Sequence, residues 1–401
     1  MAFAIHRHRL IGRRACECAV LLGTTFLLFC LMAAAWTAPL PPNQNSLRIY
    51  FVDVEGGQAT LFVTPTGRSL LIDAGWPGND GRDADRILAA ARKAGVSKID
   101  FVLVTHFHSD HVGGAPQLAA RIPIGTFIDH GENRENNDAP TVQVWQAYEQ
   151  LLATQKYKRI TAKPGDTLPI QGMEATVISS DGAVIGAPLP GAGQDNPKCK
   201  DGEHFPPDQT ENLRSLGVLI TFGKLRILDL GDLTRDKEAE LVCPRNKLGL
   251  IDIFVVSHHG WYQSNSLVFL NGIAPRVAVM DNGAKKGGTP SAWDIIEKSP
   301  RLEGLWQLHF SEEGGAAHNV ASEFIANSEG SDAANYLNLR PGRTGTSRFS
   351  TRVLRKPSDI RCGRPGNDST RPPERYQHCW VNDYQEGAII RLHSPNQGDY
   401  G

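Results

Sequence analysis

The sequence has no excess of charge of either sign. Its 401 residues include 42 Lys and Arg against 43 Asp and Glu. Removing the first 35 residues takes away four arginines and one glutamate, which leaves a formal charge of −4. A mildly acidic body lacks the positive surface with which proteins hold long nucleic acids through their phosphates. We therefore expect no stable nucleic-acid complex.

Several familiar motifs are also missing. The chain has no G-x-S-x-G nucleophile elbow, no C-x-x-C pair and no internal repeat of about 20 to 50 residues. These absences argue against serine catalysis of the α/β-hydrolase type, a cysteine-bound structural zinc and a solenoid. Since 40% of the residues are hydrophobic, the chain can still bury a sizeable core.

The N-terminus has the pattern of a targeting segment over residues 1–38. A basic stretch ends at Arg14, an uncharged apolar run extends from Ala19 to Trp36, and prolines follow. This order predicts export to the periplasm or out of the cell. The small residues 33–35 suit signal-peptide cleavage, whereas the length of the run also allows an uncleaved membrane anchor.

Four of the seven cysteines lie beyond this segment, and an even number suits an oxidising compartment. Cys362 and Cys379 bracket a loop rich in Pro, Gly and Arg, so we expect them to pair with each other and Cys199 to pair with Cys243. Four free thiols remain the alternative, because disulfide connectivity cannot be deduced from sequence.

Strand and helix patterns alternate along the first third of the chain. Residues 47–54 and 59–64 have the pattern of a hairpin, and strands at 69–73 and 99–105 flank a helix at 83–94. This alternation predicts a layered α/β core. Further strands are expected at 216–221, 225–230, 251–257 and 276–280.

Two parts of the chain are less regular. Residues 131–210 contain one expected helix, at 142–155, and Gly- and Pro-rich stretches that we interpret as surface insertions near the site. From residue 338 the chain is basic and poor in hydrophobic residues until 387–392, which has the pattern of a closing strand. We therefore expect a main domain at 45–337 and a basic, disulfide-containing extension at 338–401.

The most informative segment runs from Thr105 to His111, directly after the apolar strand 99–104. It holds three imidazoles and one carboxylate: His106, His108, Asp110 and His111. Alternate residues leaving a strand point the same way, so His106 and His108 can face one metal while Asp110 and His111 turn toward a second. This donor set suits zinc, manganese or iron. A solvated polar loop is the alternative interpretation.

This segment, with Gly113-Gly114 behind it, resembles the signature of the metallo-β-lactamase superfamily. Three further matches occur in the family's order: Leu71–Gly75, Leu230–Asp232 and Ser257–Gly260. The resemblance covers about residues 47 to 310 and implies an α/β fold, the four-layer αβ/βα sandwich, with two divalent metal ions at one edge of its sheets. Segments 51–59 and 211–216 are most similar to the hydrolase domain of ComEC-type competence proteins, although Gln58 stands where those domains usually carry an acidic residue.

The resemblance assigns roles to residues further along the chain. The Asp232 carboxylate would bridge the two metals; a turn aspartate is the alternative. Of the adjacent histidines we expect His259 to bind metal and His258 to face the substrate as a hydrogen-bond donor or proton shuttle, but the sequence leaves open which one ligates. Asp73 would orient a ligand histidine, or else cap a turn.

The histidine that usually lies between the first motif and the bridging aspartate has no clear counterpart. Asn212 occupies the approximate place, as a substrate-facing residue or weak ligand, and this favours manganese over zinc at that site. For His204 an exposed loop position is the better interpretation. Trp261, Tyr262 and Asn282 are expected at the rim, although packing explains them nearly as well, and His309 and His318 are interpreted as structural residues.

The implied chemistry is hydrolysis. A hydroxide bridging two zinc or manganese ions would attack a phosphodiester or other small-molecule substrate, and Asp110 or a water would protonate the leaving group. An amide or ester hydrolase of the β-lactamase or lactonase type is the first alternative, and a non-catalytic metal-binding envelope protein is the second. The sequence does not indicate the oligomeric state.

Overall fold

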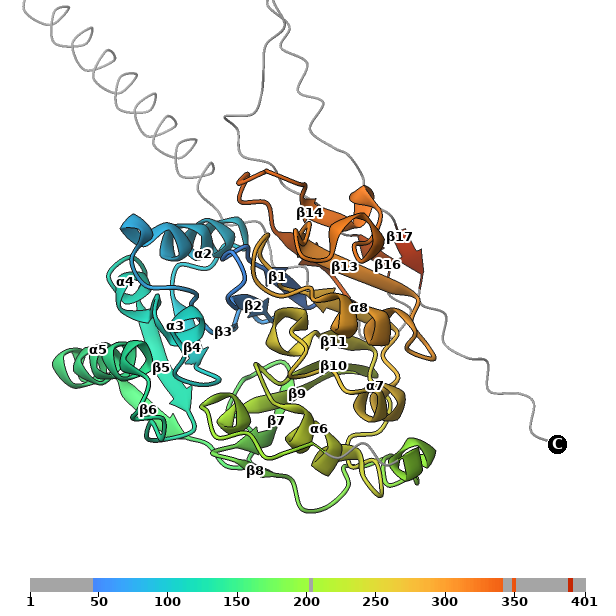
Figure 1. Cartoon of the computed structure of the whole chain (residues 1–401). Coiled ribbons are helices and arrows are strands. Elements are labelled where there is room, and N and C mark those ends of the chain that lie inside the picture. The colour runs from blue at the N-terminus through green and yellow to red at the C-terminus, as the bar shows by residue number, and fades with distance from the viewer. Residues whose placement is uncertain (1–45, 202–204, 342–347, 351–388, 392–401) are drawn as a thin grey trace, which may run out of the picture. The chain divides into compact units, whose positions relative to one another are not determined.

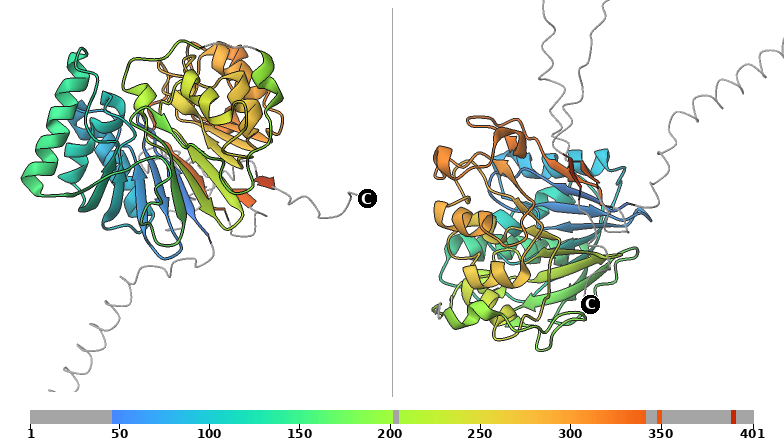
Figure 2. Two further views of the ribbon diagram at one scale, coloured as in Figure 1. Left: turned by 90° about the horizontal axis from the view of Figure 1, so that it is seen from below. Right: turned by 90° about the vertical axis from the view of Figure 1, so that its right-hand side faces the viewer.

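The computed structural model describes residues 46–201, 205–341, 348–350 and 389–391. Two β-sheets face each other, and each is covered on its outer side by helices (Figure 1). The view from below in Figure 2 shows the four layers side by side. The predicted four-layer αβ/βα sandwich is therefore confirmed.

The first sheet has seven strands in the order β15-β1-β2-β3-β4-β5-β6. The strands from β15 to β3 pair antiparallel and those from β3 to β6 pair parallel. Their bounds are β1 Arg48–Phe51, β2 Thr60–Val63, β3 Ser69–Ile72, β4 Ile99–Leu103, β5 Ile124–Asp129, β6 Lys158–Thr161 and β15 Leu337–Leu339.

The second sheet has eight strands in the order β14-β13-β12-β11-β10-β9-β7-β8. Strands β10 to β14 pair parallel, whereas β10, β9, β7 and β8 pair antiparallel. Their bounds are β7 Glu174–Ser180, β8 Ala183–Val184, β9 Gly217–Phe222, β10 Leu225–Asp229, β11 Ile253–Val255, β12 Val277–Met280, β13 Gly304–His309 and β14 Ile325–Asn327.

The helices divide between the two outer faces. The first sheet is covered by α2 Arg82–Lys93, α3 Ser109–Val112, α4 Ala115–Ala119 and α5 Ala139–Gln155; the second by α6 Arg235–Val242, α7 Leu267–Ile273 and α8 Pro290–Glu297. Three apolar clusters result, one between the sheets and one beneath each helical layer. In α2, for example, Ala84, Ile87 and Ala91 recur at helical spacing and are fully buried against the sheet.

The structure changes the interpretation of the middle third. Residues 158–184 were expected to be irregular, but they form β6, β7 and β8, and β7 pairs with β9 inside the second sheet. Ala175 and Val177 of β7 are buried in the cluster between the sheets. The strand is flanked by glycines and mixes polar with apolar residues, so its pattern is weak until the pairing partner is known.

The C-terminal expectations are met only in part. Strand β17 Ile389–Arg391 falls within the expected strand 387–392, but it pairs with β16 Arg348–Ser350 in a separate two-stranded sheet. The expected boundary at 337/338 lies within β15. The targeting segment 1–38, His204 and the pair Cys362 and Cys379 lie outside the described residues. None of the described helices is long and apolar enough to span a membrane.

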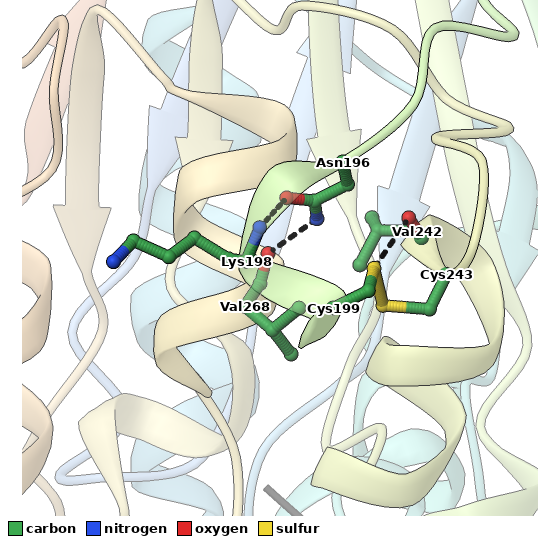
Figure 3. The surroundings of a disulfide bond; sticks show 6 residues. All are labelled: Asn196, Lys198, Cys199, Val242, Cys243 and Val268. Carbon is green, nitrogen blue, oxygen red and sulfur yellow. Dashed lines mark hydrogen bonds between the residues drawn. A yellow bond between two sulfur atoms is a disulfide. The ribbon is translucent and has the colours of Figure 1, made fainter. Parts of the chain in front are cut away.

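A disulfide joins Cys199 to Cys243, as predicted, with their Cα atoms 5.7 Å apart (Figure 3). Cys199 lies in the 3-10 helix Pro197–Asp201, and Cys243 ends α6. The Asn196 side chain anchors this segment further, because its Nδ2 donates to the Val268 carbonyl of α7 at 3.0 Å. The disulfide therefore attaches an otherwise irregular segment to the helical layer.

We expect the Cys199→Ser and Cys243→Ser variants to lower the free energy of unfolding by about 2–4 kcal/mol, since the bond closes a loop of 44 residues. Denaturant unfolding of the oxidised protein and of both variants measures this. Adding reductant should destabilise the wild type by more than it destabilises the Cys199→Ser/Cys243→Ser double variant, which lacks this bond. Equal stability of all forms would contradict a structural role.

Candidate metal centre

The residues of the centre come from the carboxyl ends of neighbouring strands. His106, His108, Asp110 and His111 follow β4, Asp232 follows β10, and His258 and His259 follow β11. Ligands in sheets of this kind gather where parallel strands end, because the polar loops leave the sheet on one side there. Three segments far apart in the sequence thus meet at one edge of the two facing sheets.

Four of these residues form one compact group. Ligand atoms of Asp110, His111, Asp232 and His259 all lie within 4.8 Å of one another, and all four residues are buried. His111 Nε2 is 3.2 Å from Asp110 Oδ2 and 3.2 Å from Asp232 Oδ1. His259 Nε2 is 3.1 Å and 3.4 Å from the same two oxygens. These separations suit one ion bound at about 2.0–2.2 Å from each donor.

The other Asp232 oxygen faces a second set of imidazoles. Its Oδ2 lies 3.3 Å from His258 Nε2 and 3.9 Å from His106 Nε2. His106 Nε2 is in turn 3.0 Å from His108 Nδ1. The carboxylate of Asp232 therefore lies between two groups of donors, as a bridging ligand would.

The two adjacent histidines reach opposite sides of Asp232 because the backbone turns sharply between them. His258 has φ 55° and His259 has φ 54°, so both adopt the left-handed conformation. This conformation costs a non-glycine residue roughly 1–2 kcal/mol. Such strain persists where the surrounding contacts enforce it, and it is common at functional sites.

Most of the histidines are oriented by a partner on the ring nitrogen that faces away from the centre. His111 Nδ1 is 2.7 Å from Asp73 Oδ2, His108 Nε2 is 3.0 Å from Glu135 Oε2, and His259 Nδ1 is 3.3 Å from Asp281 Oδ1. A nitrogen that donates to a carboxylate leaves the other nitrogen free to bind metal. The predicted orienting role of Asp73 has this geometry, and Glu135 has it as well, whereas Asp281 Oδ1 lies near His259 Nδ1 without a hydrogen bond between them.

The buried polar atoms fit a cation. Asp232 Oδ1 is buried and accepts no hydrogen bond from the described residues. Burial favours the neutral form of Asp110, yet the Lys286 ammonium and His111 hold the pKa of this carboxyl well below its usual range. Burial likewise opposes ionisation of Asp232, but His111, His258 and His259 hold its pKa well below the usual range. Two ionised carboxylates among imidazoles form a donor set for zinc or manganese.

The two adjacent histidines differ in charge. Burial lowers the pKa of His258 to about 4, so its ring is neutral near pH 7. Burial also lowers the pKa of His259, but the Asp232 and Asp281 carboxylates outweigh this and raise it to about 9. His259 belongs to the compact group, as we expected, whereas His258 approaches Asp232 from the other side.

The structure places the remaining predicted residues as follows. Asn212 is buried in the 3-10 helix Asn212–Arg214, and its Oδ1 accepts no hydrogen bond from the described residues; its metal or substrate role stays a prediction. Tyr262 is 51% exposed, and the Trp261 ring centroid is 6.4 Å from that of His258, as expected of rim residues. Asn282 is fully buried and donates to the His309 carbonyl, so its expected rim position was wrong.

The turn Glu55–Gln58 packs against the backbone of Asp110. Gln58 N donates to the Asp110 carbonyl at 3.1 Å, and a Cβ on Gly57 would lie 2.4 Å from the same carbonyl oxygen. The turn is held by Asp53, which His309 Nε2 approaches at 2.7 Å and Arg86 at 2.9 Å. These contacts fit the structural role that we expected for His309. Asp53, Glu55 and His309 could also hold a cation, but Arg86 already pairs with both acids.

Sequence reasoning missed Glu135, Asp281 and Lys286. Glu135 lies in the polar loop after β5, whereas Asp281 and Lys286 lie in the loop after β12, and Lys286 forms an ion pair with Asp110. Only Asp281 had a sequence feature that could have identified it: it directly follows an apolar strand, as Asp73 does.

Comparison with known proteins confirms the predicted resemblance. Residues 52–202 match the family model described as the metallo-beta-lactamase superfamily. Recombination protein 2 of Haemophilus influenzae, a ComEC-type protein, is 26% identical over 259 residues, which cover 63% of this chain and 26% of that protein. A metal-dependent hydrolase of Cupriavidus necator is 33% identical over 106 residues, covering 25% of this chain and 35% of the relative.

A hydroxyacylglutathione hydrolase of Rhodopseudomonas palustris is 29% identical over 106 residues, covering 26% of this chain and 34% of that protein. The matches thus span between a quarter and about a third of these relatives' lengths. Among solved structures, CmlA, a diiron beta-hydroxylase from Streptomyces venezuelae, has a TM-score of 0.38 at 14% identity and covers 67% of this chain and 53% of its own. A diphosphatase from the PhnP family has a TM-score of 0.31 at 12% identity and covers 65% and 85%.

We expect Asp73→Asn to weaken metal binding by about 10- to 100-fold, because the amide cannot reproduce the carboxylate that accepts from both His111 and Thr105. Competition with a chromogenic chelator measures the affinity. Asp85→Asn, at an exposed carboxylate paired with Arg121, is the matched control. Unchanged affinity in Asp73→Asn would show that the carboxylate does not orient His111.

Gly57→Ala should displace the Asp110 backbone, since the new methyl group would overlap its carbonyl oxygen. We expect lower metal occupancy, measured by mass spectrometry of the purified protein, together with a lower melting temperature. Gly186→Ala is the control, because a Cβ there meets no atom within 4 Å. If both variants retain full occupancy, the turn does not position Asp110.

Proposed function

Starting from the metallo-beta-lactamase superfamily domain at residues 52–202, we propose that this metal-dependent hydrolase acts on phosphodiesters. The observation that carries the proposal is the position of Asp232, whose two oxygens face two separate groups of donors. A pair of divalent cations held there would supply a nucleophile from water near neutral pH and neutralise charge on the attacking and leaving oxygens. This symmetric arrangement suits displacement at phosphorus.

The residues of the chain would perform distinct tasks in this reaction. His106, His108, His111 and His259 would hold the cations, with Asp110 and Asp232 as carboxylate ligands. Since Asp110 is held ionised, it suits the role of ligand better than that of proton donor, and a water would protonate the leaving group. His258, whose ring is neutral near pH 7, would serve as the hydrogen-bond donor or proton shuttle that faces the substrate.

Similarity to Recombination protein 2 extends over 259 residues, more than twice the 106 residues shared with the hydroxyacylglutathione hydrolase of R. palustris. The longer similarity favours the ComEC-type resemblance of segments 51–59 and 211–216, from which the phosphodiester proposal is taken. An amide or ester hydrolase is the second candidate, since the shorter similarity to the hydroxyacylglutathione hydrolase falls in the same family.

We also propose that the protein works outside the cytoplasm. The apolar segment after Arg14 supports export, and the Cys199–Cys243 disulfide suits an oxidising compartment. Zinc or manganese would be the resident metal, and the substrate would be a small molecule or a phosphodiester that does not form a stable nucleic-acid complex.

A hydrolysis screen tests the substrate class. The purified protein is treated with a chelator, reloaded with zinc or manganese, and offered bis(p-nitrophenyl) phosphate, a chromogenic cephalosporin and an aryl lactone. We expect turnover of the phosphodiester, its loss on chelation and its recovery on reloading. Turnover of the lactam or lactone alone would reject the proposal.

Asp232→Asn should lower kcat/KM for the phosphodiester by at least about 100-fold, because an amide cannot bridge two cations as a carboxylate does. The double variant His108→Ala/Asp232→Asn should be no more active. Asp85→Asn should retain wild-type kinetics. Near-normal activity of the double variant would exclude the centre described above as the reaction site.

A further inference from the structure

Lys286 is the one residue of the centre that brings a permanent positive charge to it. Its ammonium forms an ion pair with Asp110 Oδ2, the oxygen that also contacts His111 and His259. It lies over the face of Trp76, with Nζ 4.9 Å from the ring centroid. The Lys286 side chain is 31% exposed whereas that of Asp110 is 7% exposed, so a partly exposed side chain pairs with a buried carboxylate.

The backbone around Lys286 is fixed by close contacts. Gly283 N donates to the Lys286 carbonyl at 2.8 Å, and Gly288 N donates to the His259 carbonyl at 2.8 Å. A Cβ on Gly287 would lie 2.2 Å from that same His259 carbonyl, so the loop lies directly against the metal-binding turn. On its other side the loop touches Gly56, where an added Cβ would lie 2.9 Å from Lys286 Cβ.

The support for the lysine side chain is equally specific. Trp76 N donates to Asp83 Oδ2 at 2.9 Å, which ties the segment carrying the ring to the start of α2. An ammonium over an aromatic face is attracted by the ring, an interaction worth more where water is partly excluded. The side chain is therefore directed toward the centre from a fixed backbone and across a fixed ring.

We propose that Lys286 binds the anionic oxygen of the substrate and thereby selects phosphodiesters over uncharged esters. The inference rests on the proposed function, because it concerns the negative charge of the substrate that the same centre would bind. With Asp110 Oδ2 engaged by a metal, the ammonium over Trp76 would offer its positive charge to a non-bridging phosphate oxygen at the centre. A neutral ester carries no full negative charge, so the ammonium adds little to its binding affinity.

Binding of inorganic phosphate to the metal-loaded protein, followed by calorimetry, tests this without turnover. Lys286→Met should weaken phosphate binding about 10- to 100-fold, the range for a charge-assisted hydrogen bond in a partly buried site. Lys286→Arg should restore most of the affinity. Lys285→Met is the matched control, since the neighbouring lysine is exposed and lacks the contacts to Asp110 and Trp76.

The kinetic prediction is a difference between substrates. Measured at saturating metal, Lys286→Met should raise KM for bis(p-nitrophenyl) phosphate by the same factor and raise KM for p-nitrophenyl acetate much less. A residue that only supports Asp110 would instead lower metal content and affect both substrates equally. That result, or phosphate affinity unchanged within twofold, would overturn the inference.

These experiments also distinguish failure of this inference from failure of the proposed function. If the wild type binds phosphate through Lys286 but cleaves no phosphodiester, the reaction assignment fails and the anion site stands. If the wild type cleaves phosphodiesters and Lys286→Met does so with unchanged KM, the role of Lys286 fails alone. Absence of phosphate binding by the metal-loaded wild type would also overturn the role of Lys286.

Discussion

The structure depends on keeping several negative charges buried at one place. Asp73, Asp110, Asp232 and Asp281 are each at most 5% exposed, and all contact the same group of histidines. An isolated ionised carboxylate in such surroundings is very costly, and neighbouring carboxylates repel one another. Within the described residues only imidazoles and Lys286 balance them. Divalent cations would relieve this repulsion, which is the physical reason to regard the cluster as a metal centre.

Much of the centre could be predicted because its ligands occur in short local patterns. The segment from His106 to His111 follows an apolar strand, and the place of that strand in the sheet determines where the polar segment lies. Glu135 and Lys286 could not be identified in this way, since each lies in a loop whose path depends on contacts far along the chain. The same limit applies to β7, where the pairing with β9 rather than a strong local pattern determines the strand.

Gln58 shows how a departure from a family pattern can have a local cause. Its Nε2 donates to Asp229 Oδ2 at 2.7 Å, and both side chains are buried. Burial raises the pKa of Asp229 to about 7 even though the amide hydrogen bond opposes this. An acidic residue at position 58 would place a second carboxyl against Asp229, and one of the two would have to be protonated. The amide instead links the turn after β1 to the end of β10 without adding charge.

The two halves of the chain contribute unequal parts of the centre, and neither is sufficient. The family match ends at residue 202, yet Asp232, His258, His259 and Lys286 all follow it. The first half supplies His106, His108, Asp110 and His111, and the second supplies Asp232 and the imidazoles on either side of it. Asp232 Oδ1 contacts His111 of the first half and His259 of the second. The packing of one sheet against the other therefore sets the ligand geometry, and the core between the sheets must form before the centre can.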